Sequence, residues 1–256
     1  MALDPVSDAA HPARQQEVAM LGVLGGMGPM ATVDFMGKVV RNTPAARDQD
    51  HLQMVVCSAA NIPDRTAAIL GEGPDPLPAM VDALRRLEAA GVTCVAIPCN
   101  TAHHWHAALQ AMTPVRVLHI VDAVAEMLTE SDGGGLGVLA TSGTVEAGIY
   151  QERLAHRGIT CRMPDAAGQA EVMRAIRLVK AGQLAEATEI LRAQAMALVS
   201  TGCRQVVMAC TEIPVALAAE EGALRTVLVD ATEALARACV RTCMASAHDS
   251  ATSLAA

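Results

Sequence analysis

Two short segments that resemble one another hold the residues best suited to chemistry. Segment 97–103 reads Ile-Pro-Cys-Asn-Thr-Ala-His, and segment 208–214 reads Met-Ala-Cys-Thr-Glu-Ile-Pro. Each follows an apolar run, and Gly91 and Gly202 stand eight residues before Cys99 and Cys210. A thiol has an ordinary pKa of about 8.5, close enough to neutrality for proton transfer in both directions. We therefore predict that Cys99 and Cys210 face one another and do acid–base chemistry.

The stretches around these cysteines alternate between strands and helices. Strands are expected at 18–24, 52–57, 92–97 and 115–119, and helices at 29–40, 79–90, from the Cys99 turn to 112, and 122–130. This alternation predicts parallel sheets with helices on both faces. Ligands of such sheets bind beyond the carboxyl ends of the strands, which is where both cysteines fall.

The pattern restarts in the second half of the chain. Leu-Gly-Val-Leu occurs at 21–24 and 136–139, and Val-Asp-Ala occurs at 121–123 and 229–231, with a cysteine segment inside each repeat. Three pairs of matching segments that occur in the same order indicate an internal duplication. We predict an α/β fold of two pseudo-symmetric, Rossmann-like parallel-sheet domains, with helices on both faces and the active site in the cleft between them.

The expected boundaries follow from this duplication. The first half spans 18–118 and is completed by a C-terminal helix at 230–246, and the second half spans 119–229. Residues 1–17 are expected to be a disordered N-terminal extension, and residues 247–256 a flexible tail.

Composition narrows the class of protein. Apolar residues make up 52 % and charged residues 18 % of the 256 residues, which predicts a large core. A net charge of −8 argues against nucleic acid as a partner, although a local site can still bind a small anion. No apolar run reaches the roughly 18 residues that a membrane span needs. Segment 1–17 is polar and has no hydrophobic signal core, so we expect a cytoplasmic protein.

The other cysteines are expected to be structural. They include no Cys-x-x-Cys pair, and several lie inside apolar runs, where thiols behave as small hydrophobes. Cys57, at the end of an expected strand, is the one whose place could also suit a site. The remainder are Cys94, Cys161, Cys203, Cys239 and Cys243.

A glycine turn after the first strand suggests a dinucleotide site, but the pattern is incomplete. Gly26-x-Gly28-x-x-Ala31 fits a relaxed fingerprint, which also requires an acidic residue at the end of the second strand. Here that strand ends Val-Val-Cys-Ser. The alternative is that the turn exposes backbone N–H groups at a helix N-terminus to a carboxylate.

Histidines near Cys99 raise two further alternatives. Zinc could be held by His103, His104 and His106, but neighbours on a helix diverge by about 100°, so we predict no metal site. A Cys–His hydrolase would use Cys99 with His103, which lies on the same helical face. It would leave the matching Cys210 unexplained.

Four segments together resemble a known family. They are 24–32, Leu-Gly-Gly-Met-Gly-Pro-Met-Ala-Thr; 61–66, Asn-Ile-Pro-Asp-Arg-Thr; 98–103, Pro-Cys-Asn-Thr-Ala-His; and 209–212, Ala-Cys-Thr-Glu. They resemble aspartate racemase and, more broadly, the cofactor-independent aspartate/glutamate racemase superfamily, over residues 18 to about 244. The chain departs from the family at Ala209, where members commonly have glycine. Met-Gly-Pro after the first strand favours aspartate over glutamate.

The resemblance implies a two-base racemase that works without pyridoxal phosphate or another cofactor. Cys99 and Cys210 would be the two bases, and Arg65 and Lys180 would hold substrate carboxylates. Separately from the resemblance, His103 stands four residues after Cys99, and we expect it to orient that cysteine. A small acidic amino acid and a homodimer are implied as partners. The expected substrate-binding residues are Met27, Gly28, Arg65, Asn100, Thr101, Lys180, Thr211 and Glu212.

The sequence thus favours interconversion of L- and D-aspartate. Alternatives within the superfamily are a glutamate racemase, a broad-spectrum amino-acid racemase or another isomerase. A non-catalytic dicarboxylate-binding protein is the alternative from a different class.

Overall fold

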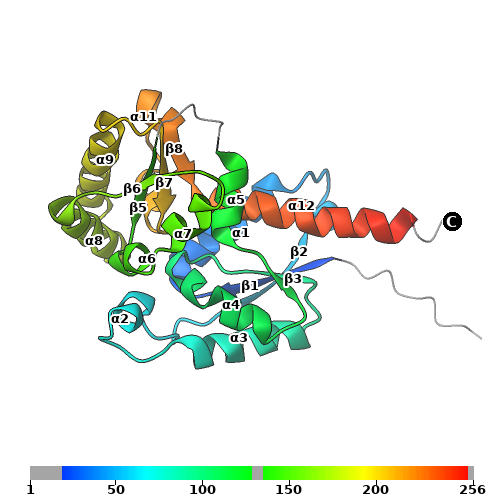
Figure 1. The fold of residues 1–256 in the computed structure, drawn as a ribbon. Helices are drawn as coiled ribbons and strands as arrows, with labels where there is room; N and C mark the ends of the chain where they lie inside the picture. Colours follow the sequence, from blue (N-terminus) through cyan, green and yellow to red (C-terminus); the bar gives the residue numbers. More distant parts are fainter. Residues whose placement is uncertain (1–18, 129–134, 253–256) are drawn as a thin grey trace, which may run out of the picture.

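The computed structural model describes residues 19–128 and 135–252, with side chains described as far as residue 245. The expected extension at 1–17 therefore lies outside the described residues, as does the end of the expected tail, 253–256. The described chain forms two parallel four-stranded sheets with helices around them (Figure 1). This confirms the predicted fold class.

The two sheets have the same topology. The first has the order β2-β1-β3-β4 and the second the order β6-β5-β7-β8, so each strand has a counterpart in the other sheet. Every pair is parallel. The strands are β1 (Met20–Gly25), β2 (Gln53–Ser58), β3 (Cys94–Ala96), β4 (Arg116–Val117), β5 (Leu136–Ala140), β6 (Cys161–Arg162), β7 (Gln205–Ala209) and β8 (Leu228–Asp230).

Central strands are buried on both faces, because helices cover both sides of each sheet. β3 and β5 are buried at every residue, which is why they read as unbroken apolar runs and not as alternating ones. The helices that follow the strands of the first sheet in sequence are α1 (Pro29–Asn42), η1 (Asp48–Asp50), α2 (Arg65–Ile69), α3 (Leu77–Ala89), η2 (Thr101–Trp105), α4 (His106–Ala111) and α5 (Ile120–Met127).

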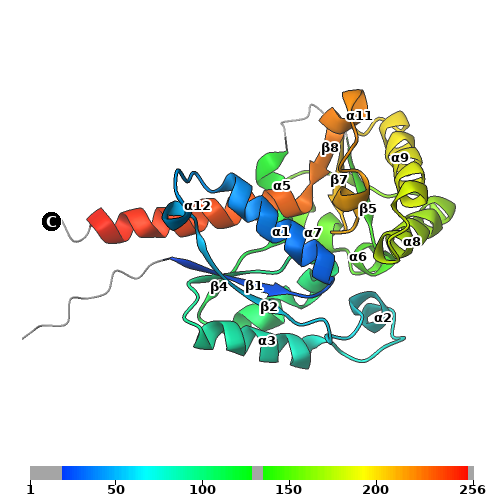
Figure 2. The same cartoon turned by 180° about the vertical axis from the view of Figure 1, so that it is seen from behind.

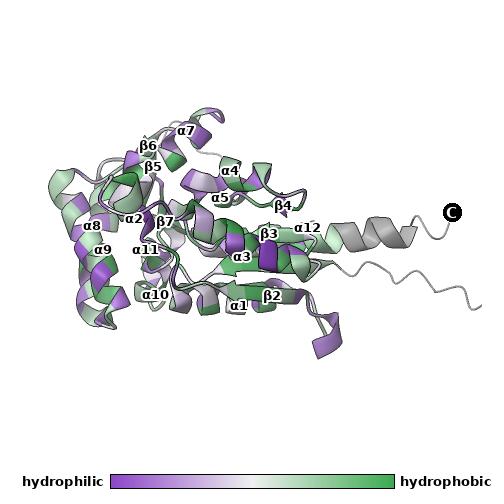
Figure 3. Cartoon of the chain, turned by 90° about the horizontal axis from the view of Figure 1, so that it is seen from below, coloured by the Kyte–Doolittle hydropathy of each residue, from purple (hydrophilic) through white to green (hydrophobic). Residues whose placement is uncertain are grey.

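The other helices follow the strands of the second sheet in sequence. They are α6 (Ser142–Glu146), α7 (Ile149–Ala155), α8 (Ala166–Lys180), α9 (Leu184–Ser200), α10 (Ile213–Ala216), α11 (Gly222–Val227) and α12 (Ala231–Thr252). Figure 3 shows α8 and α9 alternating between hydrophilic and hydrophobic residues, as expected for helices with one face on the core. Within the described ranges, no helix has the length and apolar character to cross a membrane.

Two helices are exchanged between the halves. α5 follows the first sheet but contacts α7 and β8, and α12 follows the second sheet but contacts α1, β1 and β3 (Figures 1 and 2). α5 and α12 also pack on each other, and one apolar cluster includes Val23, Val138, Val207 and Leu235 from both sheets and α12. α12 continues to Thr252, beyond the expected end at 246, so the start of the expected flexible tail is helical.

A buried lysine ties α1 to the start of α12. Lys38 Nζ lies 2.6 Å from Asp34 Oδ2 and 2.7 Å from Asp230 Oδ2, and donates to Thr232 Oγ1 at 2.6 Å. Because buried charges are costly unless paired, this cluster fixes the position of the exchanged helix.

Candidate active site

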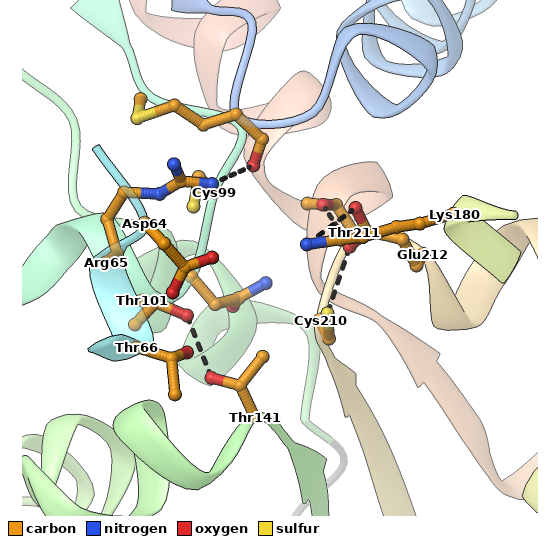
Figure 4. Close-up of a pocket in the computed structure, with 12 residues that line it drawn as sticks. Asp64, Arg65, Thr66, Cys99, Thr101, Thr141, Lys180, Cys210, Thr211 and Glu212 are labelled. Atoms are coloured by element: carbon orange, nitrogen blue, oxygen red, sulfur yellow. Dashed lines mark hydrogen bonds and ion pairs between the residues drawn. The ribbon is translucent and has the colours of Figure 1, made fainter. Parts of the chain in front are cut away.

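Loops from the carboxyl ends of both sheets meet around one small cavity. The first half contributes the turns after β1, β2 and β3, and the second half contributes those after β5 and β7 and the end of α8. Figure 4 shows Cys99 and Cys210 on different sides of this cavity. The lining residues are Met27, Asp64, Arg65, Thr66, Cys99, Asn100, Thr101, Thr141, Lys180, Cys210, Thr211 and Glu212.

The glycine turn brings the backbone of the first half close to the second. Gly26 has φ of 89°, and a Cβ there would lie 2.5 Å from the backbone of Ala59, so the turn requires glycine. Gly28 precedes Pro29, the first residue of α1. A Cβ on Gly28 would lie 3.4 Å from Glu212 Oε1, which places this predicted residue beside the cavity.

Arg65 is held by backbone carbonyls and keeps a free donor. It is the first residue of α2, after Asp64, whose side chain caps the helix by accepting from Ala67 N. Its Nη1 donates to the carbonyls of Ile62 at 3.2 Å and Pro63 at 3.0 Å, and its Nη2 donates to that of Met27 at 3.2 Å. Arg65 Nε is buried and has no hydrogen-bond partner among the described residues. A fixed cation with an unused donor suits a carboxylate.

His103 acts on the backbone of Cys99. The backbone N–H of Ile120 donates to Nε2 at 3.1 Å, so Nδ1 carries the proton and donates to the Cys99 carbonyl at 2.9 Å. Burial lowers the pKa of His103 to about 4, so the ring is neutral at pH 7. The ring therefore orients the loop that carries Cys99, and these bonds occupy both of its nitrogens.

The other two histidines lie outside the cavity lining. His106 Nε2 bonds to the carbonyl of Val117 at 2.9 Å, and His104 stacks edge-on against Trp105. In the part of the chain that the structure describes, no three His, Cys, Asp or Glu side chains are grouped so that they could hold a metal ion.

Asn100 and Thr101 make contacts that cross between the halves. Asn100 Oδ1 accepts from the hydroxyl of Tyr150 at 2.6 Å, while its Nδ2 is buried with no partner within the described ranges. The Thr101 hydroxyl lies 2.9 Å from those of Thr141 and Thr144, which are also 2.9 Å apart. No local signal in the sequence links these three partners on the second half to 97–103, so they could not be predicted.

The cavity residues of the second half form a connected polar group around Glu212. Cys210 Sγ donates to Glu212 Oε2 at 3.0 Å, and Thr211 Oγ1 donates to the same oxygen at 3.1 Å. Lys180 Nζ, at the end of α8, lies 4.0 Å from Glu212 Oε1. Burial, and then the neighbouring carboxylate, raise the pKa of Cys210 well above its ordinary value. Cys210 is therefore a thiol at neutral pH and can donate a proton.

The cavity lining thus brings together both cysteines and all of the predicted substrate-binding residues except Gly28. Gly28 lies beside the lining, and His103 bonds to the backbone carbonyl of Cys99. Asp64, Thr66 and Thr141 also line the cavity and were not anticipated. The position of Asp64 could have been predicted from the sequence, because an aspartate directly before a helix is a typical N-cap.

The fold and the cavity define a class of protein, namely two-sheet α/β enzymes with a cysteine from each half in a shared polar site. Residues 24–239 match the Asp/Glu/Hydantoin racemase family, and the chain belongs to that family. Its relatives include amino-acid racemases, and the protein is an isomerase of that class.

Individual relatives cover nearly the whole chain. The broad specificity amino-acid racemase RacX of Bacillus subtilis is 28 % identical over 232 residues, which are 88 % of this chain and 99 % of that protein. The structure of Picrophilus torridus aspartate racemase matches with 31 % identity and a TM-score of 0.77, covering 88 % of this chain and 94 % of that one. A glutamate racemase of Bacillus anthracis shares the fold, with 16 % identity, a TM-score of 0.60 and coverage of 89 % and 82 %.

Proposed function

We propose that the protein interconverts L- and D-aspartate by a two-base mechanism without pyridoxal phosphate. The observation that carries this proposal is that Cys99 and Cys210, from equivalent positions in the two sheets, line one small polar cavity. Racemisation requires removal of the α-proton from one face of the substrate and its return to the other. One thiol on each side meets this need directly.

The environment of Cys210 supports its assignment as the acid. Cys210 is held as a thiol by burial and by the hydrogen bond to Glu212. The proposed mechanism then requires Cys99 to be the base that removes the α-proton, while Cys210 gives its proton to the opposite face of the same carbon. At the end of the turnover Cys99 is the thiol and Cys210 the thiolate, which is the form that accepts the other enantiomer.

The unpartnered donors support a dicarboxylate substrate. Arg65 and Asn100 line the cavity, and each has a buried donor, Nε and Nδ2, with no partner among the described residues. Each donor would gain a partner in a substrate carboxylate. Lys180 adds a second cation, which suits a substrate with two carboxylates. Asp64 and Glu212 are the carboxylates available to the substrate ammonium.

A broad-spectrum amino-acid racemase is the second candidate. It is favoured by the similarity to the Bacillus subtilis enzyme, which extends over 99 % of that protein. The expected homodimer, the cytoplasmic location and the boundaries between the halves stay predictions.

The test is a chiral product assay with the enantiomers of aspartate, glutamate and several neutral amino acids, without added cofactor. We expect racemisation of aspartate to be fastest, and Cys99→Ala and Cys210→Ala each to abolish it while still exchanging the α-proton of one enantiomer with deuterated solvent. Cys57→Ala, which removes a thiol outside the cavity lining, is the matched control and should remain active.

Other outcomes of this assay identify the alternatives. If neutral amino acids are racemised faster than aspartate, the protein is a broad-spectrum racemase and not an aspartate racemase. Calorimetric binding of aspartate without turnover would identify a binding protein, and full activity in either single cysteine variant would exclude the two-base mechanism.

A further inference from the structure

The side-chain amide of Asn100 is held at one end and free at the other. It is 2 % exposed and directly follows Cys99. Its Oδ1 accepts from Tyr150 at 2.6 Å, and its Nδ2 has no bond to any described residue. Tyr150 is fully buried on α7, so a side chain of the second half sets the orientation of an amide in the first.

We propose that Tyr150 is a positioning residue for racemisation, which turns the Asn100 amide so that its NH₂ group faces the substrate carboxylate. This inference rests on the proposed function. Tyr150 does not line the cavity, so it acts through Asn100 and not by contact with the substrate.

The hydroxyl group decides between the two orientations of the amide. An asparagine amide is nearly symmetric in shape, so packing alone does not distinguish Oδ1 from Nδ2. With a carboxylate at the other end, the observed orientation gives a partner to both the tyrosine O–H and the amide NH₂ group. The reverse orientation would leave the buried O–H without an acceptor and set the amide oxygen against the carboxylate, and an unpaired buried donor costs about 1–3 kcal/mol.

The phenol also stays a donor over the working pH range, because burial raises the pKa of Tyr150 well above its ordinary value. The amide orientation therefore does not depend on pH. Fixing the donor before the substrate arrives lowers the entropic cost of binding.

Tyr150→Phe tests the hydroxyl alone, because the ring still fills its place in the core. Once the amide can turn, its oxygen can face the carboxylate and the hydrogen bond is lost. We expect KM for aspartate to rise about tenfold with kcat little changed, as for loss of a contact made equally in the ground and transition states. Leu154→Val, a buried change on the same helix, is the control for loosened packing and should leave KM unchanged.

Two substitutions of Asn100 distinguish a positioning role of Tyr150 from an effect on core packing. In an Asn100→Ala background, Tyr150→Phe should add no further loss, whereas a packing effect would add fully. Asn100→Asp should be worse than Asn100→Ala, because a carboxylate would then face the substrate carboxylate. If Asn100→Asp is instead the better tolerated of the two, Oδ1 faces the substrate ammonium and the proposal is wrong.

A spectroscopic test is available because Tyr150 is the single tyrosine of the chain. Aspartate binding should change the ultraviolet difference spectrum of the wild type and not that of Asn100→Ala. An unchanged wild-type spectrum together with an unchanged KM in Tyr150→Phe would overturn the inference.

These outcomes are separable from failure of the proposed function. A wild-type protein that binds aspartate without racemising it would refute the function, and an aspartate Kd raised about tenfold by Tyr150→Phe would still support the positioning role. Racemisation by the wild type with unaltered kinetics in Tyr150→Phe would refute the positioning role alone.

Discussion

Glu212→Gln isolates the effect of one negative charge on the Cys210 thiol. Glu212 Oε2 accepts from Cys210 Sγ at 3.0 Å and from Thr211 Oγ1 at 3.1 Å. A glutamine amide oxygen can take the position of Oε2 and accept both bonds. The substitution therefore removes the charge, and with it the ion pair with Lys180, and preserves both hydrogen bonds.

The size of the effect follows from the geometry. Two unit charges 3.0 Å apart interact by about 5 kcal/mol at an effective dielectric constant of about 20. Lys180, whose Nζ lies 4.0 Å from Oε1, offsets part of the field of the carboxylate. Taking roughly half of the interaction, and about 1.4 kcal/mol for each pKa unit, we expect the pKa of Cys210 to fall by about 2 units.

The pH dependence of kcat/KM reports this change. Cys210 must be protonated to act as the acid, so its deprotonation defines the alkaline limb of the profile. In the wild type the raised pKa of Cys210 places that limb at high pH. In Glu212→Gln the limb should lie about 2 units lower. The two enantiomers have equal free energy in water, so kcat/KM must be the same in both directions for every variant, which checks each data set.

Thr211→Val is the matched control. It removes one hydrogen bond to the same oxygen and leaves the charge, so its alkaline limb should move far less than that of Glu212→Gln. An alkaline limb that stays in place in Glu212→Gln, with Tm unchanged, would refute the assignment of Cys210 as the resting acid.

Three further substitutions test other parts of the structure. Arg65→Lys loses the guanidinium fork and should lower kcat/KM about 100-fold in the racemisation assay, whereas unchanged kinetics would exclude a contact with the substrate. Lys38→Met leaves the carboxylates of Asp34 and Asp230 without their shared cation and should lower the free energy of unfolding in urea by about 3 kcal/mol. The pKa of His103 is about 4 in the folded protein and about 6.5 in the unfolded chain, so the unfolded chain takes up this proton first as the pH falls. The free energy of unfolding should therefore decrease by about 3 kcal/mol between pH 6.5 and pH 4. That drop should be smaller in His103→Asn, and an identical pH dependence of unfolding would contradict it.

The sequence predicts the fold well because its signals are local. Buried strands such as β3 and β5 read as apolar runs, and the repeated Leu-Gly-Val-Leu at 21–24 and 136–139 falls on equivalent strands, β1 and β5. The same local signals predict that Cys99 and Cys210 lie beyond the carboxyl ends of strands, and both cysteines line one cavity beyond β3 and β7.

Contacts between the halves could not be predicted in the same way. Tyr150 donates a hydrogen bond to Asn100, and the hydroxyl groups of Thr101 and Thr141 bond to each other. The sequence around each of these residues gives no indication of its partner. The spacing of His103 from Cys99 correctly indicated proximity. It did not indicate that the ring would bond to the carbonyl, because that depends on the N–H of Ile120 behind it.

The exchange of α5 and α12 has a consequence for how the chain folds. The first sheet is covered on one side by a helix made last, and α7 of the second half packs on a helix made before that half begins. During synthesis, the apolar residues of the first sheet that pack on α12 therefore stay uncovered until α12 has been made. A fragment that lacks α12 would expose the apolar cluster shared by both sheets, so the two halves should unfold in a single cooperative transition although each has its own sheet.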